Sequence, residues 1–435
     1  MLLISRRSRL TGLVRIPASK SHTIRAIAAG SLANGSSTIR NPLISADTIS
    51  AIDAYRTFGA EIQVGTDIRI DGLSGLMRTP DDVINVGNSG TSLYIAMGTA
   101  ALNSSWSIFT GDEQIRNRPA GPLLDALTGL GAKAFSTRGD GRPPLAISGP
   151  IRGGKITLDG SKTSQYLTSL LMNCPLAGED TEINIAGAVE IPYINMTLGW
   201  LDDLGVRYEH DGYAKFIIPG RQMFKAFDKR IPGDFSSAAF FLCAAAITES
   251  QIEIYGLDMN DTQGDKGIID ILVKMGVKIE PIMNGGMKVT GRYLTGGEFD
   301  LGDMPDTLPA LAAVACYAEG TTRLVNVAQA RLKETDRIRV MCEELSKMGA
   351  LIRELPDGLE IVGSPLQAAT LNGHGDHRVV MALSIAGMGC ADWTQVDSAE
   401  SINVTFPNFV ELMQGINAEI GKEIDRFDLF GGGIG

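Results

Sequence analysis

Cationic and small polar side chains gather at recurring points along this 435-residue chain. One such group, near the N-terminus, contains Lys20, Ser21 and Arg25. The others are Gly87-Asn88-Ser89-Gly90-Thr91, Arg116-Asn117-Arg118, Thr163-Ser164-Gln165, Arg331-Leu332-Lys333-Glu334-Thr335-Asp336-Arg337 and Asp376-His377-Arg378. Such side chains bind phosphates and carboxylates, above all where the free N–H groups and dipole of a helix N-terminus add to them. The pattern therefore predicts binding sites for small anions.

Each group taken singly also has an ordinary structural explanation. Small polar loops cap helices, a lone Lys or Arg is usually surface charge, and Thr335 suits a capping turn. The neighbouring His374 and His377 lack thiol or acidic partners at ligand spacing, so we expect no metal. The sequence contains neither a GxxxxGK[ST] loop nor a GxGxxG that follows a strand, which counts against nucleotide-binding folds.

A repeated pattern predicts the elements that position these groups. An apolar helical stripe runs into a glycine, followed by a half-buried strand, at Gly59, Gly131, Gly205, Gly276 and Gly349. Successive glycines are 72, 74, 71 and 73 residues apart. Each glycine suits a left-handed helix C-cap, where a side chain would clash. A degenerate sixth copy is expected near Gly415.

A second marker recurs with the same period. Small or polar residues precede Ala/Leu-rich stretches at Ser21, Thr91, Ser164, Ser237, Thr307 and His377. Each predicts a loop that enters the N-terminus of a buried helix. The chain therefore divides into six repeats of about 72 residues, each with two helices and several strands.

A third marker groups the six repeats. Ile16-Pro17-Ala18-Ser19 resembles Ile231-Pro232-Gly233-Asp234, 215 residues further on. Two X-Pro turns would also explain the likeness. We interpret it as two domains of three repeats each, with the chain crossing between them at the prolines.

Composition limits the classes of protein. The chain has 39 Lys+Arg and 50 Asp+Glu, a net charge of −11, which argues against nucleic acid and anionic membranes as partners. The five scattered cysteines are expected to be buried reduced thiols of a cytosolic protein. We expect neither a signal peptide nor a membrane span, because the longest apolar stretch, Ala238 to Ile247, has ten residues.

Taken together and in order, these motifs resemble the 5-enolpyruvylshikimate-3-phosphate synthases, or 3-phosphoshikimate 1-carboxyvinyltransferases. The resemblance covers nearly the whole chain. It implies an α/β (α+β) fold of two domains, each with three βαβαββ repeats in an inside-out, barrel-like architecture. One domain would combine residues 1–19 with 232–435, and the other would be residues 20–231. Substrates would bind between the domains, which then close.

The resemblance also implies the reaction and the roles of residues. The family transfers the enolpyruvyl group of phosphoenolpyruvate to the 5-hydroxyl of shikimate 3-phosphate and releases phosphate. Asp306 matches the base, Glu334 matches the group that moves the proton at the methylene carbon, and Lys20 assists both. Shikimate 3-phosphate would contact Lys20, Ser21, Arg25, Thr163, Ser164, Gln165, Tyr193, Asp306, Gln329 and Lys333. Phosphoenolpyruvate would contact Lys20, Asn88, Gly90, Arg118, Gln165, Arg337 and Arg378. We expect a cytoplasmic monomer without metal or cofactor.

Four positions depart from the family's pattern. The family commonly has Arg at Tyr94, Ser at Glu190, Asn at Gln329 and Lys at Val404. Losing two cations should weaken the phosphate pocket for phosphoenolpyruvate. Glu190 would repel a substrate phosphate, so either its side chain points away from that site or the match to the family's pattern is shifted at this position.

Two other classes of function remain open at this point. The UDP-N-acetylglucosamine enolpyruvyl transferases share the repeat and the chemistry, but they typically use a Cys in a mobile loop. The corresponding Gly111-Asp112-Glu113-Gln114-Ile115 has none. A non-catalytic repeat scaffold would need no cations at equivalent helix starts.

Overall fold

The structure, a computed structural model, describes residues 1–422 and divides them into two compact lobes. The continuous lobe is Ala18–Pro232, and the split lobe joins Met1–Pro17 to the chain from Gly233 onward. Each lobe buries its own hydrophobic core. Each is therefore built like an independent folding unit.

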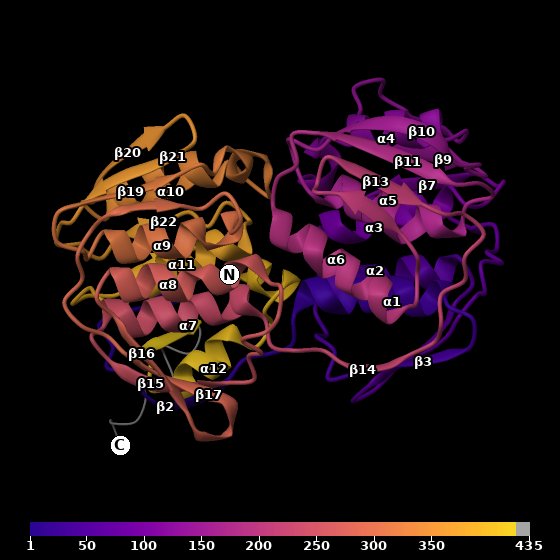
Figure 1. The fold of residues 1–435 in the computed structure, drawn as a ribbon. Coiled ribbons are helices and arrows are strands. Elements are labelled where there is room, and N and C mark those ends of the chain that lie inside the picture. Colours follow the sequence, from indigo (N-terminus) through magenta and orange to yellow (C-terminus); the bar gives the residue numbers. More distant parts are fainter. Residues whose placement is uncertain (423–435) are drawn as a thin grey trace, which may run out of the picture. The chain divides into compact units, whose positions relative to one another are not determined.

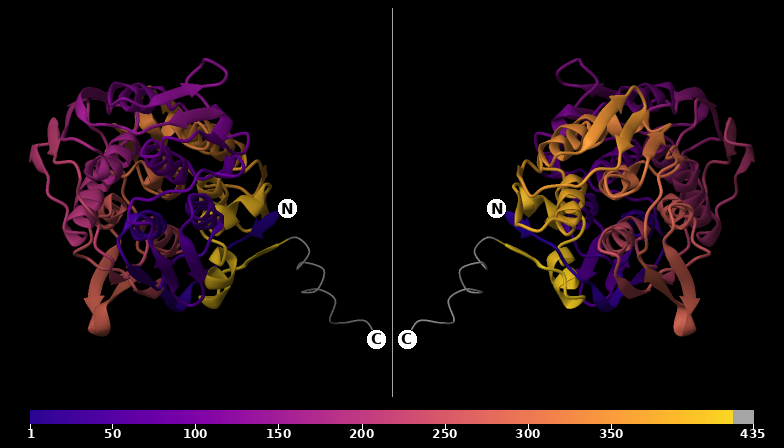
Figure 2. Two further views of the ribbon diagram at one scale, coloured as in Figure 1. Left: turned by 90° about the vertical axis from the view of Figure 1, so that its right-hand side faces the viewer. Right: turned by 90° about the vertical axis from the view of Figure 1, so that its left-hand side faces the viewer.

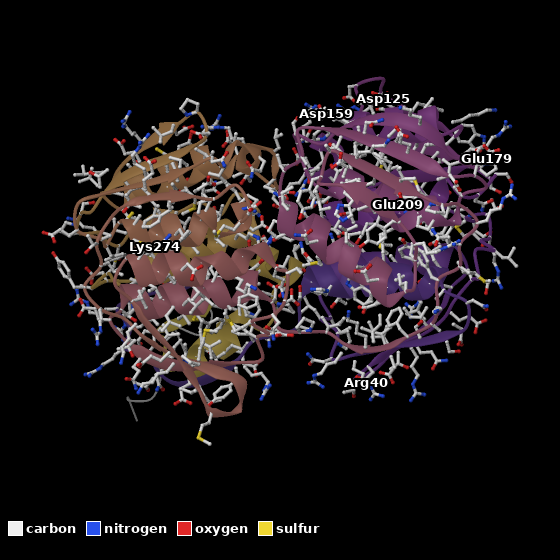
Figure 3. All side chains as sticks on the ribbon, viewed as in Figure 1. Arg40, Asp125, Asp159, Glu179, Glu209 and Lys274 are labelled. Atoms are coloured by element: carbon white, nitrogen blue, oxygen red, sulfur yellow. The ribbon has the colours of Figure 1, made fainter. Side chains whose placement is uncertain are left out.

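The continuous lobe contains three four-stranded sheets among the described residues. In sheet order their strands are β14 (Asp228–Arg230), β3 (Ser36–Arg40), β5 (Ile68–Asp71) and β4 (Glu61–Val64); β6 (Ile84–Asn85), β7 (Ser107–Thr110), β9 (Leu145–Ser148) and β8 (Lys133–Ser136); and β10 (Gly154–Asp159), β11 (Thr181–Ala186), β13 (Lys215–Ile218) and β12 (Glu209–Asp211). In the first sheet, Arg40 of β3 forms a bidentate ion pair with Asp228 of β14, with both N–O distances 2.6 Å. The side chain of Arg40 is labelled in Figure 3.

The described part of the split lobe also contains three four-stranded sheets. Their strands are β2 (Thr11–Arg15), β15 (Gln251–Tyr255), β17 (Gly286–Thr290) and β16 (Lys278–Ile282); β18 (Glu298–Asp300), β19 (Thr321–Val325), β21 (Gly358–Val362) and β20 (Leu351–Leu355); and β22 (Thr370–Leu371), β23 (Thr394–Val396), β1 (Leu3–Ser5) and β24 (Ile420–Lys422). Two of these sheets lie at opposite ends of the lobe, with helices between them (Figure 1).

All six sheets share one topology. In the orders given, the first pair of strands is parallel and the next two pairs are antiparallel. Three repeats are continuous in sequence. In the other three, one strand comes from a distant segment: β14, β2 or β1. The prediction of an α/β fold with six βαβαββ repeats is confirmed within residues 1–422.

The second marker of each repeat begins an almost completely buried helix. These helices are α1 (Lys20–Leu32), α3 (Gly90–Ala100), α5 (Gln165–Asn173), α7 (Phe235–Ile247), α9 (Leu308–Ala315) and α11 (His377–Gly387). Every residue of α3, α9 and α11 is buried, as expected for helices that are apolar on all sides. Figure 2 views several of them nearly end-on. The predicted buried helix starts are confirmed.

The second helix of each repeat is amphipathic and ends where the glycine marker predicts. These helices are α2 (Ala46–Thr57), α4 (Gly121–Gly129), α6 (Ile191–Asp203), α8 (Ile268–Lys274), α10 (Arg337–Lys347) and α12 (Phe409–Gly415). The five predicted glycines have φ between +73° and +111°. In the sixth repeat the left-handed residue is Asn417, with φ 65°, two residues beyond the expected Gly415. Asparagine tolerates this conformation better than most other residues.

Equivalent hydrogen bonds mark the two points where the chain passes from one lobe to the other. Within the split lobe, Asp234 N donates to Pro17 O at 2.9 Å, and within the continuous lobe Ser19 N donates to Pro232 O at 2.8 Å. Asp234 and Pro232 lie 215 residues after Ser19 and Pro17, and this is the spacing of the third marker. The side chains of Ser19 and Asp234 then cap α1 and α7.

The remaining described elements are short. They are the 3-10 helices η1 (Ile115–Asn117), η2 (Cys174–Leu176), η3 (Gly264–Gly267), η4 (Met283–Gly285), η5 (Pro305–Thr307), η6 (Ala328–Leu332) and η7 (Ala399–Val404). All five cysteines are free thiols, and only Cys342 is partly exposed. None of the helices in residues 1–422 combines the length and apolarity that crossing a membrane requires.

Candidate functional site

In the continuous lobe, Lys20 is the first residue of α1 and lies close to an acidic partner. Its Nζ is 3.1 Å from Oδ2 of Asp47, in the first turn of α2, and both side chains are largely buried. The carboxylate holds the ammonium group in place at the helix start. Sequence reasoning missed Asp47, because an acidic residue in a first helical turn is common.

Arg25, one turn further along α1, is a buried cation that hydrogen-bonds neutral groups. Its guanidinium donates to the carbonyl oxygens of Ser21 at 3.1 Å and Tyr193 at 3.3 Å. It also donates to the hydroxyls of Thr197 at 3.0 Å and Thr168 at 3.2 Å. Burial lowers the pKa of Arg25 to about 10. A buried cation held by neutral groups favours an anionic ligand nearby.

Thr163 and Ser164, at the start of α5, bind a carboxylate of the protein itself. Oε2 of Glu190 accepts hydrogen bonds from Ser164 N at 3.0 Å, Ser164 Oγ at 2.8 Å and Thr163 Oγ1 at 3.3 Å. The side chain of Glu190 therefore points towards two residues that are predicted to contact shikimate 3-phosphate. A helix N-terminus attracts an anion, and the buried carboxylate of Glu190 occupies that position.

Gln165 follows Ser164 in the chain and is the first residue of α5. Its backbone N–H donates to Thr163 Oγ1 at 3.3 Å. Its side-chain Oε1 is buried and accepts no hydrogen bond within the described part of the chain.

At the start of α3, the backbone makes room for a guanidinium group. A Cβ on Gly90 would lie 2.9 Å from Nη1 of Arg118, so the missing side chain lets Arg118 pack against the helix start. Asn88 instead donates to Asp112 at 2.5 Å and Gln114 at 2.7 Å.

Tyr94 does not supply the cation that the family commonly has at its position. Its hydroxyl donates to the carbonyl of Pro119 at 2.8 Å, and the hydroxyl of Tyr166 donates to the same oxygen at 2.6 Å. Tyr94 therefore fixes the loop that carries Arg118.

In the split lobe, Arg337 joins three carboxylates from three different segments. Its guanidinium donates to Asp306 at 2.7 Å, to Glu334 at 2.5 Å, and to Asp376 at 2.8 and 3.1 Å. Arg378 is 3.1 Å from the second carboxylate oxygen of Asp306. The structure therefore brings together the two predicted acid–base residues and two of the predicted phosphoenolpyruvate ligands.

Burial and neighbouring charges shift the pKa values of three groups in and around this cluster. Burial by itself would raise the pKa of Asp306, but Arg378, Lys333 and Arg337 hold that pKa well below its usual range. Burial lowers the pKa of His377 to about 3 against the opposing effect of neighbouring carboxylates, so the imidazole is neutral. Burial, with the nearby charge of Asp306, raises the pKa of Asp265 to about 7.

The last two predicted residues of the split lobe come from the segment before α10. Gln329 donates through Nε2 to the carbonyl of Gly302 at 2.9 Å. Lys333 lies close enough to Asp306 for its charge to lower the pKa of that carboxyl.

Comparison with known proteins decides the family. The family model described as EPSP synthase (3-phosphoshikimate 1-carboxyvinyltransferase) matches residues 4–413. The chain belongs to the EPSP synthase family. A 3-phosphoshikimate 1-carboxyvinyltransferase from Acetivibrio thermocellus is 51% identical over 421 residues, covering 97% of this chain and 99% of the relative. One from Ruminiclostridium cellulolyticum is 49% identical over 421 residues, with the same coverage.

Solved structures of EPSP synthase and of a related transferase share the fold. EPSP synthase from Acinetobacter baumannii is 26% identical with a TM-score of 0.81, and the match covers 97% of this chain and 99% of that one. The enolpyruvyl transferase NikO from Streptomyces tendae has a TM-score of 0.80 over 97% of this chain and 98% of its own, at 20% identity. That second likeness concerns the fold alone.

Several residues that support the EPSP synthase motifs were not in the predicted site. Asp376 binds Arg337, while Thr168 and Thr197 hold Arg25. The acidic first position of Asp376-His377-Arg378 was a usable signal, because a helix N-cap beside two basic motifs suggests a charge partner. The two threonines lie inside α5 and α6, and nothing in their sequence context singles them out.

Proposed function

We propose that the two groups of residues described above together carry out the reaction of the EPSP synthase family. That reaction transfers the enolpyruvyl group of phosphoenolpyruvate to the 5-hydroxyl of shikimate 3-phosphate and releases phosphate. It is a transferase reaction of the shikimate pathway, which leads to the aromatic amino acids. The observation that carries the proposal is the cluster of Asp306, Glu334, Arg337 and Arg378 in the split lobe.

The continuous lobe supplies most of the proposed contacts to shikimate 3-phosphate. Arg25 offers a buried positive charge, and the start of α5 offers the N–H and hydroxyl donors of Thr163 and Ser164. These groups suit a phosphate and a carboxylate. The remaining proposed contacts are Lys20, Ser21, Gln165 and Tyr193 from the same lobe, and Asp306, Gln329 and Lys333 from the split lobe.

Phosphoenolpyruvate is proposed to bind the arginines that are now paired with Asp306. Arg337 and Arg378 both contact that carboxylate, and a substrate carboxylate is a competing partner for the same guanidinium groups. As the substrate takes over these contacts, the pKa of Asp306 rises towards a value useful for a base. The other proposed contacts are Lys20, Asn88, Gly90, Arg118 and Gln165.

The proposed chemistry is an addition followed by an elimination. Asp306, assisted by Lys20, accepts the proton of the 5-hydroxyl as its oxygen bonds to C2 of phosphoenolpyruvate. Glu334 delivers a proton to the methylene carbon, which gives a tetrahedral intermediate. Removal of a proton from the resulting methyl group re-forms the double bond while the C2–O bond to phosphate breaks. The cations stabilise the charge that develops on the departing phosphate.

The test is a phosphate-release assay with phosphoenolpyruvate and either of two acceptors. Shikimate 3-phosphate should give inorganic phosphate and a 5-enolpyruvyl product, whereas UDP-N-acetylglucosamine should give none. Release with the second acceptor alone would assign the chain to the related enzyme class instead. Folded protein that releases no phosphate with either acceptor would support a non-catalytic scaffold.

Three further proposals accompany this function. The two lobes are proposed to be the two domains that share the substrate contacts. The enzyme is proposed to be a monomer. It is proposed to act in the cytoplasm, where its reduced cysteines are stable.

A further inference from the structure

Glu190 occupies an anion-binding position that the proposed function assigns to a substrate phosphate. Its Oε2 accepts hydrogen bonds from the backbone N–H of Ser164 and from the hydroxyls of Ser164 and Thr163. These donors lie at the start of α5, a helix of nine residues whose dipole adds to their attraction for negative charge. The residue is 3% exposed, so water screens this carboxylate little.

The backbone at Glu190 is held in an uncommon conformation. Its φ is 54° and its ψ is 47°, in the left-handed region, and it directly precedes α6, which has Pro192 in its first turn. Residues other than glycine and asparagine rarely adopt this backbone conformation, and it persists where surrounding contacts enforce it. Three hydrogen bonds to a single carboxylate oxygen supply such contacts. The placement of this carboxylate is therefore a defined part of the fold.

A phosphate at the same donors would meet Glu190 directly. Two negative groups that share three donors at hydrogen-bond range repel each other, and the donors can fully satisfy only one of them. The phosphate of the acceptor must therefore displace the carboxylate of Glu190.

We propose that Glu190 is an internal competitor for the acceptor phosphate and sets the affinity and selectivity of the enzyme for phosphorylated acceptors. The proposal rests on the proposed function, because it takes the start of α5 as the binding site of the 3-phosphate. Glu190 acts as a specificity residue through the donors that it occupies. It lowers the affinity for shikimate 3-phosphate and has little effect on unphosphorylated shikimate.

The test compares Glu190→Ser and Glu190→Gln with the unaltered enzyme by isothermal titration calorimetry. Glu190→Ser should bind shikimate 3-phosphate at least about tenfold more tightly, because the donors become available. Glu190→Gln should shift in the same direction, because it keeps the size but removes the charge. The affinity for shikimate should change less than about twofold in both variants. Unchanged or weaker binding of shikimate 3-phosphate by both variants would overturn the proposal.

A second measurement uses inorganic phosphate as the probe and does not depend on turnover. Phosphate should raise the melting temperature of Glu190→Ser at concentrations that leave the unaltered enzyme unaffected. Equal shifts in both proteins would contradict the proposal. The matched control is Glu209→Ser, which removes one exposed carboxylate of β12 in the same lobe and should behave as the unaltered enzyme (Figure 3).

Measurements on the same proteins distinguish a failure of this inference from a failure of the proposed function. If the unaltered enzyme releases phosphate from shikimate 3-phosphate and phosphoenolpyruvate but the Glu190 variants bind the acceptor no better, only this inference fails. If the unaltered enzyme releases none with either acceptor, the proposed function fails. If Glu190→Ser does not fold, Glu190→Gln carries the test, since it can keep the hydrogen bonds to Ser164.

Discussion

The guanidinium of Arg337 binds the carboxylate of Asp376 at two points, with Nε to Oδ2 at 2.8 Å and Nη2 to Oδ1 at 3.1 Å. Arg337 is the first residue of α10, and Asp376 caps α11. The pair therefore ties together the starts of two helices, and both side chains are fully buried. The same guanidinium also reaches Asp306 and Glu334, so this contact orients the proposed acid–base residues.

Replacing Asp376 by Asn should destabilise the split lobe. The change removes one charge from a buried pair, and breaking such a pair typically costs about 3–5 kcal/mol. For a lobe of this size we expect a melting temperature lower by about 6–20 °C in a thermal unfolding scan. The control is Glu343→Gln, which breaks an exposed ion pair with Arg339 on α10 and should cost less than about 1 kcal/mol. If both substitutions lowered the melting temperature equally, the buried pair would contribute no more to stability than the exposed pair.

Stability should fall below neutral pH partly because of His377. Its pKa is about 3 in the folded protein, compared with the ordinary value of 6.5. Above pH 6.5 the histidine is neutral in both states and contributes nothing. As the pH drops below 6.5, the unfolded chain takes up a proton that the folded protein does not, so stability is lost down to the folded pKa.

The measurement compares the unaltered protein with His377→Asn in urea unfolding at several pH values. Between pH 6.5 and pH 5, the unaltered protein should lose about 1.5 kcal/mol more than the variant. Parallel pH profiles for the two proteins would contradict a depressed histidine pKa. His210, which is exposed, provides the matched control as His210→Asn.

Two glycines of α3 should respond differently to alanine. A Cβ on Gly90 would lie 2.9 Å from Nη1 of Arg118, at the flexible end of a side chain, so the guanidinium can move and the fold is preserved. We expect the KM for phosphoenolpyruvate to rise about tenfold, because a displaced guanidinium binds the substrate less well. Steady-state kinetics and a thermal scan measure the two effects.

Gly98, two turns further along the same helix, is the matched comparison. Its Cβ would lie 2.5 Å from Nδ2 of Asn173 and 2.6 Å from Oγ of Ser169, both held inside the core. Gly98→Ala should therefore destabilise the protein by about 1–3 kcal/mol. A KM effect of equal size at both positions would argue against a specific role for Gly90.

Much of the architecture could be predicted because its signals are local. A backbone position with positive φ after an amphipathic helix strongly favours glycine. Because of this preference, the glycines from Gly59 to Gly349 mark the period of about 72 residues in the sequence. Where asparagine replaces glycine, at Asn417, the signal weakens, and the sequence predicted only a degenerate copy near Gly415. The burial of helices that are apolar on all sides can likewise be predicted from the sequence.

The sequence by itself determined the repeat, the buried helix starts and the types of side chain gathered at them. Only the tertiary structure decided which strand completes each sheet, such as β1 between β23 and β24. It alone paired Arg337 with Asp376 and placed the carboxylate of Glu190 at the start of α5. The physical reason is that the partner of a charged side chain depends on which segments packing brings within about 3 Å, and residue type and spacing along the chain do not specify that.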